Sequence, residues 1–161
     1  MVPHSIVTAF LLVITGSTAA FADEVIQMTP PEYKAFSDVA REFGSIKSFE
    51  SHKNTTSAEM TSDGFIYFVH IENKNGAPCE DNCTIILKAC TSKVKTPDYD
   101  DFSEWSNNYY SYIVRVKEES GACLVLNAPS YKQPLTADKL QSVFRTWLQE
   151  VDKFKHKFQI E

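Results

Sequence analysis

Residues 63–71 read DGFIYFVHI and carry the clearest strand signal in this chain of 161 residues. Asp-Gly is a favoured turn pair, and the residues after it are the aromatic and β-branched types that strands prefer. Side chains alternate between the two faces of a strand, so each face receives every second residue. One face, expected in the core, carries Phe65, Tyr67, Val69 and Ile71. The other carries Ile66, Phe68 and His70 and is also largely apolar.

Four more strand signals accompany this one. They are a weak signal at Ile46 and Phe49 that runs into the polar residues 54–62, and clearer signals at 83–91, 110–117 and 122–128. Short turns rich in Asn, Gly and Ser join neighbouring strands, and such turns imply antiparallel pairing.

Helical periodicity marks three segments. The first covers residues 30–43, the second follows a cap at Thr96 or Asp98, and the third runs from a cap at Thr136 to Phe158. The third segment has one apolar stripe, consisting of Leu140, Val143, Phe144, Trp147, Leu148, Val151, Phe154 and Phe158. We therefore predict one α+β domain in the order α-β-β-β-α-β-β-α, with a five-stranded antiparallel sheet and helices on one face.

The amino-terminal segment has the composition of a secretory signal peptide. Residues 1–22 contain no Lys, Arg, Asp or Glu, and the apolar run at 6–14 is too short to span a bilayer. Small residues ending at Ala22 predict cleavage before Asp23, which leaves a mature domain of residues 23–161 with no stable membrane insertion. An uncleaved anchor is the alternative, because the segment lacks the usual basic residues at its start.

Four cysteines in an exported chain favour two disulfides, because secreted proteins meet an oxidising environment. Strand parity places Cys90 and Cys123 on the same side of the sheet, where they can meet if their strands are neighbours. Cys79 and Cys83 then close a short loop. We predict the pairs Cys79–Cys83 and Cys90–Cys123.

The second face of the sheet is too apolar for a surface that meets only water. Its predicted interface residues are Ile66, Phe68, Ile86, Ile113 and Val125. A contiguous apolar patch of this kind marks an interaction surface. The alternative is that helices or loops cover each of these side chains.

Chemistry-bearing motifs are absent from the sequence, so we predict no catalytic residue, no metal site, no cofactor and no enzyme activity. The net charge of −5 and the lack of a basic block exclude nucleic acid as a partner. The rival hypothesis is a binder of small molecules or envelope sugars, or a hydrolase, that uses the aromatic cluster near Tyr109 with His70 and Asp63.

Several short motifs, in their order along the chain, resemble the YbjN domain family. They are Phe43-Gly44, Asp63-Gly64-Phe65, Cys83 at a strand start, Phe102-x-x-Trp105-x-Asn107, Ala122–Leu126, Leu135–Leu140 and Trp147–Phe154. The resemblance implies a fold like that of type III secretion chaperones, a bacterial source and a periplasmic address. It supplies no catalytic residue.

The hypothesis from the sequence is therefore a non-enzymatic, chaperone-like protein of the periplasm. Its second sheet face is expected to hold an envelope protein or a second copy of the chain as a homodimer. A disulfide-stapled structural protein without a ligand is a third alternative.

Overall fold

The computed structural model describes residues 34–52, 55–73, 83–91, 98–108, 110–115, 121–131 and 134–160. The predicted leader, residues 1–22, lies outside these ranges. The elements follow the order α-β-β-β-β-α-β-β-α. They are α1 (Lys34–Ala40), β1 (Ser45–His52), β2 (Thr55–Ser62), β3 (Phe65–Asn73), β4 (Cys83–Thr91), α2 (Tyr99–Asn108), β5 (Tyr112–Arg115), β6 (Ala122–Tyr131) and α3 (Ala137–Phe158).

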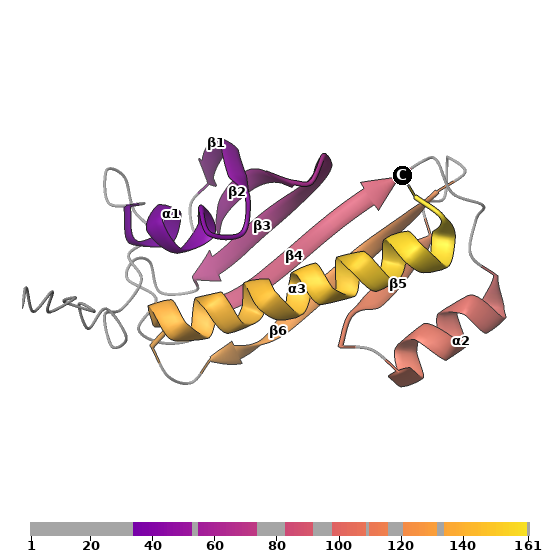
Figure 1. Ribbon diagram of the computed structural model, residues 1–161. Helices are drawn as coiled ribbons and strands as arrows, with labels where there is room; N and C mark the ends of the chain where they lie inside the picture. Colours follow the sequence, from indigo (N-terminus) through magenta and orange to yellow (C-terminus); the bar gives the residue numbers. More distant parts are fainter. Residues whose placement is uncertain are drawn as a thin grey trace, which may run out of the picture.

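The sheet has six antiparallel strands in the order β1-β2-β3-β4-β6-β5, so the prediction of five strands is wrong (Figure 1). The error lies in residues 45–62, where β1 and β2 pair as two strands instead of one weak strand and a polar loop. The signal of β2 is weak because Ala58 and Met60 are its only hydrophobic residues. Both are buried, and pairing with β1 and β3 on either side stabilises this polar strand.

The helices lie on one side of the sheet, which we call the helix-covered face (Figure 1). The long helix α3 runs along this face, and its predicted apolar stripe is confirmed. Six of the stripe residues are buried, namely Leu140, Val143, Phe144, Trp147, Val151 and Phe154. Trp147 packs on Tyr67 of β3, with ring centroids 5.9 Å apart. Burial of large side chains at this helix–sheet contact is the main source of stability in the fold.

The short helix α1 packs against the first half of α3. Its Phe36 lies 6.2 Å from Phe144, and Phe43, just after the helix, stacks on the same ring at 5.2 Å. The chain then turns at Gly44, where a Cβ atom would lie 2.5 Å from the carbonyl oxygen of Thr61. Only glycine permits this close approach of α1 to β2.

Helix α2 packs against the second half of α3. Its cap is Asp98, whose Oδ1 accepts a hydrogen bond from the Asp101 amide at 3.0 Å. Trp105 is fully buried and meets Phe154 of α3 edge to face, with centroids 5.9 Å apart. The structure therefore assigns the cap to Asp98 rather than to Thr96, which lies outside the described residues.

A buried carboxylate joins α3 to the start of β5. Glu150 is 1% exposed and accepts hydrogen bonds from the Ser111 amide at 3.3 Å and the Ser111 hydroxyl at 2.7 Å. The Trp105 indole N–H donates to the same hydroxyl at 2.9 Å, and the Lys153 ammonium lies 2.9 Å from the carboxylate. Charge alone predicts an exposed Glu150, but these partners compensate the cost of burying it.

The orientation of strand β5 is the reverse of the prediction: the face predicted to lie outside the core is turned toward it. Ile113 pairs with Leu124 and is 6% exposed, so it belongs to the core on the helix-covered face. The prediction that places Ile113 on the second face is therefore wrong. The strand has only four residues, with Ile113 and Arg115 in one set and Tyr112 and Val114 in the other, so parity within it does not fix which set faces the core.

Candidate functional site: the uncovered sheet face

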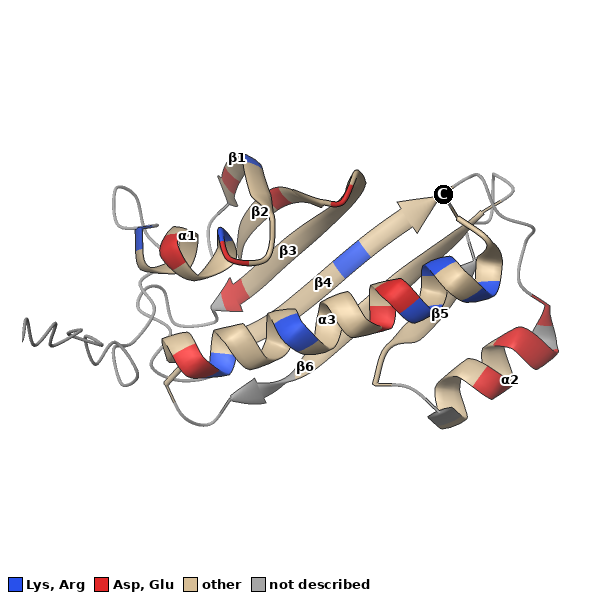
Figure 2. Ribbon diagram, in the orientation of Figure 1, with Lys and Arg blue, Asp and Glu red and all other residues tan. Residues whose placement is uncertain are grey.

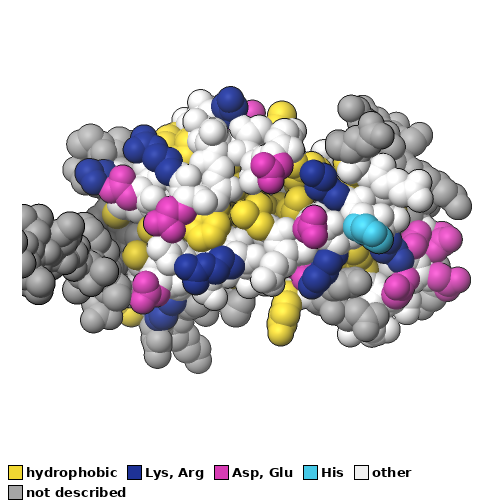
Figure 3. Space-filling model, viewed as in Figure 1, with side chains coloured by type: hydrophobic (Ala, Val, Ile, Leu, Met, Phe, Trp, Pro, Cys, Tyr) yellow, Lys and Arg dark blue, Asp and Glu magenta, His cyan; other side chains and the backbone are white. Residues whose placement is uncertain are grey.

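No described helix packs on the opposite side of the sheet, which we call the uncovered face. A single row of Cα partners crosses it from edge to edge: Ser48, Glu59, Phe68, Lys88, Val125 and Tyr112. Figures 1 to 3 view the molecule from the helix-covered side. The space-filling view shows charged side chains of both signs over that side, with hydrophobic ones between them (Figure 3).

Exposed hydrophobic side chains are concentrated on the uncovered face. Among the described residues, five large hydrophobic side chains are exposed, and four of them lie here: Ile66 (50%), Phe68 (40%), Tyr112 (43%) and Val114 (42%). The fifth, Tyr110, precedes β5. Large apolar side chains exposed together mark an interaction surface.

The five predicted interface residues differ in their accessibility. Ile66 and Phe68 are exposed, as an interface requires, and Ile86 is half-buried. Val125 lies on this face but is only 5% exposed, between its cross-strand neighbours Lys88 and Tyr112.

Two residues of the surface, Tyr112 and Val114, are absent from the predicted set. Pairing with β6 places them there, because Val114 lies directly opposite Cys123 and therefore shares its face. Ile113, in their place in the prediction, belongs to the core.

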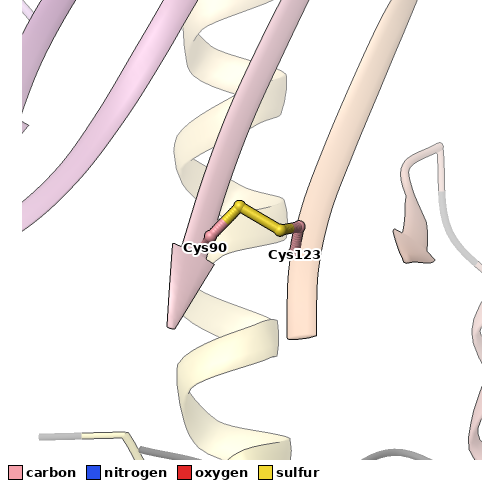
Figure 4. The surroundings of a disulfide bond; sticks show 2 residues. All are labelled: Cys90 and Cys123. Carbon is pink, nitrogen blue, oxygen red and sulfur yellow. A yellow bond between two sulfur atoms is a disulfide. The ribbon is translucent and has the colours of Figure 1, made fainter. Parts of the chain in front are cut away.

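A disulfide crosses the uncovered face between two neighbouring strands, as predicted (Figure 4). Cys90 of β4 and Cys123 of β6 are direct Cα partners, 4.0 Å apart. Cys83 is also disulfide-bonded, and Cys79, its predicted partner, lies outside the described residues. These bonds indicate an oxidising compartment outside the cytoplasm.

His70 lies at the centre of this face, between β2 and β4. Its Nδ1 shares a hydrogen bond with the Ser57 hydroxyl at 2.7 Å, and its ring stacks on Phe68 at 6.2 Å. Partial burial, with a smaller contribution from the Lys88 charge, lowers the pKa of His70 below its usual value, and Glu72 opposes this shift. The imidazole is therefore neutral at pH 7.

The Ser57–His70 pair lies between paired strands of the sheet. Both β2 and β3 pair with strands on each side, so the ladders engage the backbone N–H groups from which an oxyanion hole is built. Asp63 lies at the opposite end of β3, seven residues from His70 or about 23 Å along an extended strand. Tyr109 lies outside the described residues.

A small crevice is present on the helix-covered side. It lies between the β2–β3 turn and α3, and its lining includes Asp63, Phe65, Asp152 and Lys155. The Lys155 ammonium lies 5.9 Å from the centroid of the Phe65 ring, so this crevice already contains a cation. Over the described ranges, no three His, Cys, Asp or Glu side chains gather as a metal site would require.

The helices of the described part of the chain also lack the combination of length and hydropathy that crossing a membrane demands. Comparison with known proteins finds no matching family model, no matching curated protein and no matching solved structure. The resemblance to the YbjN family therefore stays a prediction.

Proposed function

We propose that the chain is a non-enzymatic binding module that holds another polypeptide on its uncovered sheet face. The observation that carries this proposal is the exposure of Ile66 and Phe68 on β3 and of Tyr112 and Val114 on β5, about 14 Å away, on a face that no described helix covers. An apolar sheet face is stabilised by burial against another element. The missing layer is then supplied by a partner.

The dimensions of the face support the proposal. Six strands spaced about 4.8 Å apart span about 24 Å, and five of them, with 8 to 10 residues each, extend about 25 Å or more, whereas β5 has four residues. The resulting area of about 600 Å² approaches the roughly 800 Å² that each partner buries in a stable interface.

The cellular setting belongs to the same proposal. The leader composition of residues 1–22 and the resemblance to the YbjN family support export to a bacterial periplasm, and the disulfide is consistent with this compartment. The partner is accordingly an envelope polypeptide, and a chaperone-like role agrees with the fold that the resemblance implies.

Site-specific photo-crosslinking tests this proposal in intact cells. We expect a photoreactive phenylalanine analogue at Phe68 or Tyr112 to yield a discrete polypeptide adduct. Arg145 and Gln149, both exposed on α3, are control positions at which no such adduct should form. Adducts of equal yield at all four positions, or none at Phe68, would contradict a binding role for the uncovered face.

A further inference from the structure

We propose that the uncovered face binds a partner segment with large apolar side chains on one side and Lys or Arg along the flank that faces β1 and β2. This inference rests on the proposed function and specifies its occupant. It is carried by the unequal distribution of apolar and acidic residues across the face.

The apolar half extends from β3 to β5. Phe68 and Ile66 lie on β3, and Tyr112 and Val114 lie on β5. Between them, Lys88 is the neighbour of Phe68 on one side and Val125 on the other. Its aliphatic stem continues the apolar surface while the ammonium group reaches water.

The acidic half extends from β1 to β3 and consists of Glu50, Glu59 and Glu72. Each of these residues has uncharged cross-strand partners. Glu50 faces Ser57, Glu59 lies between Ser48 and Phe68, and Glu72 lies between Thr55 and Thr84. Within the described ranges none of the three takes part in an ion pair. Figure 2 shows acidic segments on β1, β2 and β3 and a basic one on β1, whereas the charged residue of β4 is basic.

Lys88 does not neutralise these carboxylates. It is two strands away from Glu59 in the same row, which separates the two Cα atoms by about 10 Å. Negative charge therefore remains beside the exposed Phe68. A ligand that covers Phe68 brings its neighbouring side chains close to Glu59, where Lys or Arg is favoured.

A second copy of the chain matches this pattern poorly. If two uncovered faces met around a two-fold axis along the row of Glu59 and Phe68, Glu59 would face Glu59 of the other copy. An axis along the strands, between β3 and β4, would instead place Glu59 on Val125 and its apolar surroundings. The first arrangement is repulsive and the second desolvates unpaired carboxylates.

The geometry suits a helix that lies along the strands. The nine residues of β3 extend about 30 Å, which equals the length of an α-helix of about 20 residues. A helix with side chains is about 10 Å wide and so covers two to three strands. A helix over β3 and β4 places its apolar stripe on Phe68 and Ile86, while one flank lies beside Glu59 of β2.

Two synthetic amphipathic peptides of about 20 residues test the inference directly. Both carry the same Leu and Phe stripe, but one has Lys along a flank and the other has Glu. Fluorescence anisotropy with the mature protein should show about tenfold tighter binding of the Lys peptide, which corresponds to a few exposed ion pairs.

Variants separate the two contributions. In the Glu59→Gln/Glu72→Gln variant, the affinity for the Lys peptide should fall to that for the Glu peptide. In Phe68→Ser, the affinity for both peptides should fall. Asp152→Asn, which removes an exposed carboxylate of α3, is the matched control and should change neither affinity.

Three results would overturn the inference, and they differ in what they imply for the proposed function. Equal affinity for the two peptides would refute the basic flank and leave the apolar docking face in place. Self-association in sedimentation experiments that Phe68→Ser abolishes, without peptide binding, would identify a second copy as the occupant. Absence of both peptide binding and self-association would refute the docking face itself.

Discussion

Removal of the Cys90–Cys123 bridge is expected to destabilise the domain strongly. The bridge joins residues 33 positions apart in the sequence. In the chain-entropy model, a cross-link of this loop length lowers the entropy of the unfolded chain by about 12.5 cal/mol/K, which equals about 3.7 kcal/mol at 25 °C. The Cys90→Ala/Cys123→Ala variant should therefore lose about 3–4 kcal/mol of its free energy of unfolding, a large part of the 5–15 kcal/mol typical of a domain.

Urea denaturation followed by tryptophan fluorescence measures this loss. Trp105 and Trp147 are both fully buried, so their emission reports the folded core. The slope of the free energy against urea concentration should also rise in the variant, because an unfolded chain without the cross-link exposes more surface.

A matched control distinguishes this bridge from the other predicted one. Cys79→Ala/Cys83→Ala removes a cross-link between residues four positions apart, for which the same model gives about 2 kcal/mol. If the Cys90→Ala/Cys123→Ala variant lost less than about 1 kcal/mol, or less than this control, the chain-entropy reasoning would be refuted.

Three further perturbations follow from single residues of the fold. Glu150→Leu should lower the free energy of unfolding, measured by urea denaturation, by about 3 kcal/mol because it leaves the buried Ser111 donors without an acceptor. Glu150→Gln should lower it less because the amide oxygen still accepts a hydrogen bond. Gly44→Ala should lower the thermal midpoint of unfolding more than Gly64→Ala does. The Cβ added at Gly44 lies 2.5 Å from the Thr61 carbonyl oxygen, whereas Gly64 faces open space. Equal shifts of the midpoint in the two variants would contradict this prediction. The lowered pKa of His70 means that the unfolded state takes up its proton first as the pH falls. The contribution of His70 to the free energy of unfolding is complete above about pH 6.5 and is lost as the pH falls toward the folded pKa. NMR titration measures this folded pKa, and a His70→Asn variant assigns the imidazole signal.

Patterns within single elements predicted much of the fold. The stripe of α3 repeats with the helical period, so Trp147 and Phe154 are identified as core residues without reference to any other segment. Alternation in β3 likewise separates Tyr67 from Phe68, and the disulfide follows from the parity of Cys90 and Cys123.

The candidate site was only partly predictable. Ile66 and Phe68 lie in a strand with a clear register, so their exposed face follows from alternation. The predicted interface contains Ile113 instead of Tyr112 and Val114, because the four residues of β5 are too short a pattern to fix its orientation. Their true orientation is set by pairing with Val125 and Cys123, which a pattern within β5 does not contain.

The sequence by itself determined the properties that depend on one element or on residue spacing: the α+β content, the core stripe of α3, the two faces of β3 and the shared side of Cys90 and Cys123. Only the tertiary structure decided that residues 45–62 form two strands, that Ile113 faces the core, that Glu150 is buried and that no described helix covers the second face. The physical reason is that periodicity records which side chains of an element avoid water. Which neighbouring element shields them, or leaves them exposed, depends on contacts between segments far apart in the chain.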